Sequence, residues 1–187
     1  MKTCRENYFF DYTFSKKSQI WVETALYTLI GLTLITIILS ITIPQITKIK
    51  ERSIIRQSIN SLDALHREIL EVSDVAGNIR VIFLKSDKGT FEIDPVQDKI
   101  TFILENSPLQ FSEPGQKIKY GEIFIETVAV GKRYTIRLEL DYASTFDITA
   151  DGGDGIKVIH GGTNRLKVEN VGDNHIGEKV HLDFDIV

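Results

Sequence analysis

The feature that most constrains this chain is a long apolar stretch near its N-terminal end. From Thr24 through Thr47 no residue carries a charge, and leucine, isoleucine and threonine fill most positions. A helix of this length extends roughly 35 Å at about 1.5 Å per residue, which is enough to cross the hydrocarbon core of a bilayer. The stretch therefore predicts a transmembrane helix at residues 19–45.

An acidic residue lies in the first turns of this helix. Glu23 precedes the apolar stretch, and a carboxylate is costly in lipid, so we interpret it as a functional position. The alternative is an ordinary signal anchor with an interfacial glutamate. A cleavable secretory peptide fits poorly, because its apolar core would span only about 7–15 residues. Charge does not fix the orientation, since Lys48 and Lys50 follow the helix as Lys16 and Lys17 precede it.

The residues around Glu23 resemble the class III signal of archaeal type IV pilins. The basic pair Lys16 and Lys17 precedes the small residue Ser18, and Gln19 and Glu23 follow in the family's spacing. The resemblance implies that a prepilin peptidase recognises this segment and cuts between Ser18 and Gln19, and that Glu23 acts in assembly. The chain departs from the family at Ser18, where glycine or alanine is usual.

This resemblance also implies a function. A chain of this family is a structural subunit of an archaeal type IV pilus-like surface filament that serves adhesion. It is a single-pass membrane protein with its C-terminal domain outside until membrane-bound pilus assembly machinery adds it to the cell-surface filament. Self-assembly runs through the N-terminal helix, where Glu23 pairs with the amine that cleavage creates at Gln19 of a neighbour. The alternatives are an archaellin-like motility subunit and a membrane-anchored exported binding protein that does not polymerise.

The net charge of the chain is mild and gives no sign of a nucleic-acid partner. The net charge is −4, and residues 1–18 carry four basic and two acidic side chains, a sum of +2, so the remainder carries −4 − 2 = −6. The single cysteine, Cys4, lies in the predicted leader. The processed chain would therefore have neither disulfides nor thiol chemistry.

Small and hydroxyl residues recur along the apolar helix. Their side chains either let neighbouring helices approach and exchange hydrogen bonds or bond to the helix's own carbonyl groups, and the sequence favours neither. The residues are Thr28, Gly31, Thr33, Thr36, Ser40 and Thr42. Pro44 removes a hydrogen bond, so we expect the helix to bend or locally melt there.

A second helical pattern occupies residues 46–76. After a charged junction from Lys48 to Arg52, apolar residues recur at helical spacing and form one stripe, which needs a sheet or helix to cover it. The stripe consists of Ile54, Ile55, Ile59, Leu62, Leu65, Ile69, Leu70 and Val72. His66 falls within its arc, and we interpret it as a packed or half-exposed histidine rather than a ligand. Gly77 ends the helix.

The period changes to two after Gly77, which predicts a β head at residues 77–187. We expect a hairpin turning at residues 86–89, a strand at 100–104, a loop at 106–117 and a hairpin about Gly131. Shorter strands follow at 146–149, 156–160 and 165–171, and the chain ends in a strand from Val180. The fold class is therefore α+β, with the long helix packed on an antiparallel β-sandwich or open barrel of eight or nine short strands.

Motifs for chemistry are absent from the sequence. The turn at Asp151 and Asp154 lacks the closing glutamate of a calcium loop, and His160, His175 and His181 do not have metal-site spacing. No nucleophile has a recognisable context. We predict no catalytic residue, no metal site and no cofactor, and hence a structural protein rather than an enzyme.

Overall fold

The computed structural model describes the backbone of residues 16–172 and 179–187, and the side chains within these ranges from residue 20 onward. The chain divides into two compact units, one that ends at Gln45 and one that spans Ile46–Val187. Residues 1–15 of the leader predicted at residues 1–18 lie outside the described part.

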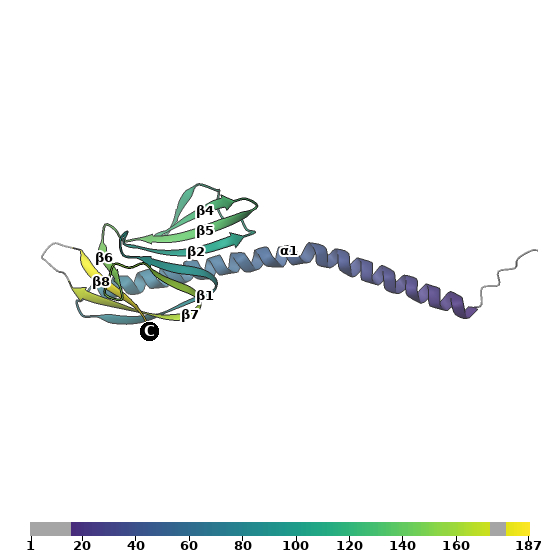
Figure 1. The fold of residues 1–187 in the computed structure, drawn as a ribbon, viewed down its shortest axis with the longest axis horizontal. Coiled ribbons are helices and arrows are strands. Elements are labelled where there is room, and N and C mark those ends of the chain that lie inside the picture. Colours follow the sequence, from purple (N-terminus) through teal and green to yellow (C-terminus); the bar gives the residue numbers. More distant parts are fainter. Residues whose placement is uncertain (1–15, 173–178) are drawn as a thin grey trace, which may run out of the picture. The chain divides into compact units, whose positions relative to one another are not determined.

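Helix α1 spans Lys16–Ser73 (Figure 1). Pro44 lies inside it, and the helix continues on both sides. Of the two predicted effects of Pro44, local melting does not occur, because the intact hydrogen bonds of the adjoining turns hold the helix together. The predicted bend stays a prediction. The chain leaves the helix at Ser73, and Gly77 follows with a positive φ of 78° that glycine adopts without strain.

The second half of α1 has the amphipathic face that its spacing predicts. One stripe of apolar side chains is buried, namely Ile55, Ile59, Leu62, Leu65, Ile69 and Val72. Leu70 does not belong to it: its side chain is 44% exposed, because it lies one residue beyond Ile69 and so about 100° around the helix. The stripe therefore presents one continuous apolar surface within the unit Ile46–Val187.

Eight strands form one sheet around this stripe. The sheet curls into a half-barrel, as Figure 1 shows, with the strand order β3-β4-β5-β2-β1-β7-β8-β6. An α+β fold with an open barrel is thus confirmed. The strands are β1 (Ile79–Asp94), β2 (Lys99–Ser107), β3 (Lys117–Tyr120), β4 (Ile123–Val130), β5 (Arg133–Asp141), β6 (Phe146–Ala150), β7 (Lys157–Gly172) and β8 (Val180–Ile186).

Several features of the sheet differ from the prediction. The strands predicted at 156–160 and 165–171 form one continuous strand, β7. β6 pairs with β8 in parallel, whereas the other neighbouring strands are antiparallel as expected. β3 begins at the end of the predicted loop and is an edge strand of four residues. All four of its side chains are exposed, so it lacks the alternation between buried and exposed positions that identifies a strand in sequence.

The predicted hairpin at residues 86–89 is wrong. β1 continues through these residues as one long strand, and β7 accompanies it on one side, with Ser86 opposite Gly162 and Thr90 opposite His160. The register shift between these pairs is a bulge, in which three residues of β1 oppose one residue of β7. Gly89 is needed there, since its φ is 94° and a Cβ would lie 2.6 Å from the Phe102 ring.

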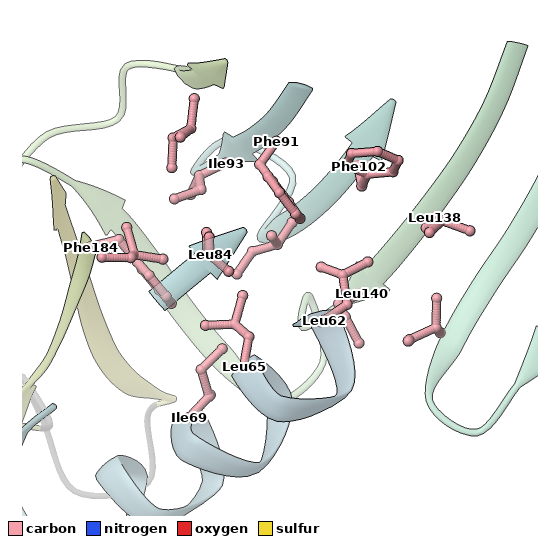
Figure 2. Close-up of a cluster of buried hydrophobic side chains, with 14 of the residues drawn as sticks. Leu62, Leu65, Ile69, Leu84, Phe91, Ile93, Phe102, Leu138, Leu140 and Phe184 are labelled. Atoms are coloured by element: carbon pink, nitrogen blue, oxygen red, sulfur yellow. The ribbon is translucent and has the colours of Figure 1, made fainter. Parts of the chain in front are cut away.

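The hydrophobic core fills the space between α1 and the curled sheet. In Figure 2, Leu62, Leu65 and Ile69 project from the helix toward apolar side chains of the strands. The rings of Phe91 and Phe102 lie 5.0 Å apart between their centroids, on neighbouring strands. The second half of α1 is therefore part of the head domain's core.

Candidate functional site

The first half of α1 has a surface unlike that of a soluble helix. The apolar side chains from Ile20 to Ile43 are exposed on every side of the helix. The helix is long and apolar enough to cross a membrane, and none of its most apolar stretch is buried within the described structure. Apolar surface in water costs about 25 cal/mol per Å², so this segment needs lipid or other helices around it.

Hydroxyl side chains in this segment bond to their own helix. Thr24, Thr33, Thr36, Ser40 and Thr42 each donate to the carbonyl oxygen four residues earlier, at 2.7–2.9 Å. Thr28 donates in the same way, at 3.0 Å. These hydroxyl groups are therefore satisfied within a single chain and need no bond from another helix to avoid an unpaired polar group in an apolar environment.

The residues that resemble a prepilin signal lie at the start of α1. The backbone of Lys16, Lys17, Ser18 and Gln19 is helical, and their side chains are outside the described part of the structure. Glu23 is exposed, and its carboxylate makes no ion pair or hydrogen bond with the side chains described from residue 20 onward. Gln19 lies four residues before Glu23, which is about one helical turn.

A groove lies on the head domain between α1 and the edge strand β3. Its volume is about 470 Å³, within the size range of small-molecule sites. We call it the α1–β3 groove, and its lining consists of Arg56, Ile59, Asn60, Phe111, Ile118, Tyr120 and Ile125. The Arg56 guanidinium is exposed and has no ion pair or hydrogen bond among the described residues. The groove thus combines apolar walls with one free positive charge.

Sequence reasoning missed a buried acid on α1. Glu51 is only 6% exposed, and the sequence analysis placed it in the charged junction from Lys48 to Arg52 without predicting its burial. The Lys88 ammonium, which comes from the β1 bulge, donates to Glu51 Oε1 at 2.7 Å. Glu51 Oε2 and Ser58 Oγ are buried without a hydrogen-bond partner among the described residues. No local signal identifies this pair, because it depends on a bulge that the sequence pattern presents as a turn.

His66 is half-buried, as the sequence predicts. Its Nδ1 lies 2.9 Å from the Tyr142 hydroxyl, and the two rings stack with their centroids 5.8 Å apart. Burial raises the pKa of the Tyr142 phenol, and the negative charge of Glu122 raises it further. The hydrogen bond from Lys119 and its positive charge lower the pKa of Glu122. The histidine therefore has a packing partner and a hydrogen bond.

The aspartate-rich turn after β6 binds its own chain. Asp151 forms an ion pair with Lys157, and the Gly152 N–H donates to Asp183 Oδ1 at 2.8 Å. Thr149 donates to the same oxygen at 2.7 Å. Within residues 20–172 and 179–187, no three histidine or acidic side chains come together in a group that could hold a metal ion.

Comparisons with known proteins do not place the chain in a family. No protein-family model, no curated protein and no solved structure matches it.

Proposed function

We propose that this chain is a structural subunit of a surface filament of the archaeal type IV pilus kind, serving adhesion. The observation that carries the proposal is the division of α1 into two halves. The first is apolar and exposed on all sides, and the second contributes the buried stripe of the head. A subunit with this division buries its first half in lipid before assembly and against other copies afterwards.

The residues before Glu23 support the same proposal. Lys16, Lys17 and Ser18 have the spacing of a prepilin peptidase site, with the cut before Gln19. Cleavage frees an amine at Gln19, and Glu23 provides a carboxylate that has no partner among the described side chains of its own chain. In a helix bundle the amine of one copy and the carboxylate of another neutralise each other, which makes assembly depend on processing.

A membrane-anchored binding protein is a second candidate. The α1–β3 groove favours it, because its volume is within the range of ligand sites and its walls are apolar.

An archaellin-like subunit is a further alternative to the pilus. The Trp21-Val22-Glu23 segment favours a pilin over it, since archaellins tend to carry small residues and glycine there.

The N-terminal residue of the protein recovered from cells tests the proposal. We expect shed filaments to contain a chain that begins at Gln19, as found by N-terminal sequencing and intact mass. Replacing Lys16 and Lys17 with glutamine should leave the chain uncut and abolish the filaments, whereas Lys48→Gln, beyond the apolar stretch, is the matched control. A protein that still starts at Met1 would contradict processing. Cleaved protein that stays in the membrane without filaments would favour the binding protein.

A further inference from the structure

The α1–β3 groove and the exposed half of α1 have complementary surfaces. We propose that the groove of one copy binds the N-terminal half of α1 from a second copy, with Glu23 of the second copy against Arg56 of the first. This inference rests on the proposed self-assembly and names the surface that receives the helix.

The walls of the groove are suited to an apolar helix. Ile118 and Tyr120 come from β3, the edge strand of the sheet, and both side chains are exposed to solvent. Ile125 and Ile59 form the buried floor. Apolar side chains that enter the groove would cover this surface and remove it from water, which is favourable in proportion to the area buried.

The charges select the part of the helix that enters. Arg56 is a free cation at the groove, and Glu23 is a free carboxylate on the apolar half of α1, among the described residues. Ile20 and Tyr27 are exposed and lie three residues before and four residues after Glu23, so they share its face of the helix. That face offers an acid between two large apolar side chains, and the groove offers a guanidinium beside apolar walls.

Arg56 and the Gln19 amine are compatible partners. A carboxylate has two oxygens and accepts hydrogen bonds at both, so one oxygen can accept from the amine of one neighbour and the other from the guanidinium of another. A carboxylate that is withdrawn from water needs several donors to offset its lost hydration. The groove therefore supplies a second partner for a charge that assembly would bury.

The contact has a consequence for symmetry. It joins two different surfaces, a groove on one copy and a helix on the next, so the first copy retains an unused helix and the second an unused groove. A contact of this type repeats from copy to copy and forms an open array unless its rotation closes a ring. A groove-to-helix contact is thus of the kind that extends a filament.

Disulfide cross-linking between single-cysteine copies tests the proposal. Cys4 is the chain's only cysteine and is first replaced by serine. One tagged full-length copy then carries Tyr27→Cys, and a second copy with a different tag carries Ile118→Cys or, as an independent position, Tyr120→Cys. Both are expressed together and oxidised in the membrane and in filaments. The control is Val158→Cys on β7, because Val158 is 47% exposed and Ile118 is 44% exposed.

We expect the mixed dimer to be several-fold more abundant when the second copy carries Ile118→Cys or Tyr120→Cys than when it carries Val158→Cys. Arg56→Gln should lower its yield several-fold and Arg56→Lys should restore part of it, whereas Arg52→Gln, outside the groove lining, should leave it unchanged.

Two outcomes would overturn the groove contact. The first is filaments whose chains begin at Gln19 but which give no mixed dimer above the control. That result would mean that the groove does not bind α1 of a second copy and is instead a site for a small amphiphile or another protein. A disulfide that forms only between two copies of the Ile118→Cys variant would place groove against groove instead of groove against helix. Mixed dimers without filaments would support the contact and contradict the filament.

Discussion

At the scale of single residues, Tyr142 connects the stability of the head to pH. Burial raises the pKa of its phenol above the ordinary value of about 10. The neutral phenol therefore contributes stability that is fully present below about pH 10 and is lost as the pH rises toward the folded-state pKa. We expect residues 46–187 to lose more stability between pH 9 and 11 than the Tyr142→Phe variant does, as measured by urea unfolding.

The same substitution has a separate effect at neutral pH. It removes the hydrogen bond to His66 and should cost about 0.5–1.5 kcal/mol. Tyr120→Phe is the control, because the Tyr120 ring is exposed to solvent. Hydrogen bonds from Lys167 to Asp185 and Glu169 raise the lysine's pKa, so Lys167 also contributes to the loss of stability at high pH. The loss from Lys167 is common to the wild type and the Tyr142→Phe variant, so it cancels when the two are compared. Equal pH dependence in the wild type and Tyr142→Phe would contradict the prediction.

At the scale of elements, the buried stripe of α1 determines whether the head folds. Leu62 and Ile69 are completely buried, so Leu62→Asp or Ile69→Asp would place an unpaired charge in an apolar core. Each should lower the free energy of unfolding of residues 46–187 by several kcal/mol. Leu70→Asp makes the same chemical change next to Ile69 at an exposed position, so we expect only a small loss. Similar losses at positions 69 and 70 would mean that the stripe does not face the sheet.

Elements with a local pattern were predictable, and elements set by distant contacts were not. Helical spacing predicted the stripe, and strict alternation predicted the hairpin of β4 and β5 about Gly131. Residues 86–89 have the sequence of a turn, but β7 pairs with β1 both before and after them. The chain therefore continues as one strand with a bulge instead of reversing direction. The buried Glu51 follows from that bulge, because its partner Lys88 comes from it. The groove depends on where β3 ends relative to α1, which no residue pattern specifies.

At the scale of the whole molecule, the two halves of α1 require different surroundings. The stripe from Ile55 to Val72 is covered by the chain's own sheet, whereas the segment from Ile20 to Ile43 is covered by nothing in the described part of a single chain. The free energy available from covering the second surface exceeds that of a typical surface contact, because the segment is apolar all round. In the proposed filament, association would therefore be driven by α1, and its specificity would come from the few polar groups on this helix.

Glu23 is the polar group on which we propose that this specificity depends. Near the membrane surface its carboxylate stays partly hydrated, so it costs less than the roughly 2.5–3.5 kcal/mol found for acids at the bilayer centre. Among the packed helices of the proposed filament, the carboxylate would lose that water and need partners, which we propose are the Gln19 amine of one neighbour and Arg56 of another. We expect Glu23→Ala to leave processing and membrane insertion intact but to reduce filament yield sharply, measured as sheared filament protein relative to membrane-bound protein. Thr24→Ala, at the next position, is the control, because Thr24 bonds only to its own helix within the described structure. Normal filament yield from Glu23→Ala cells would show that the carboxylate is an interfacial residue without a pairing role.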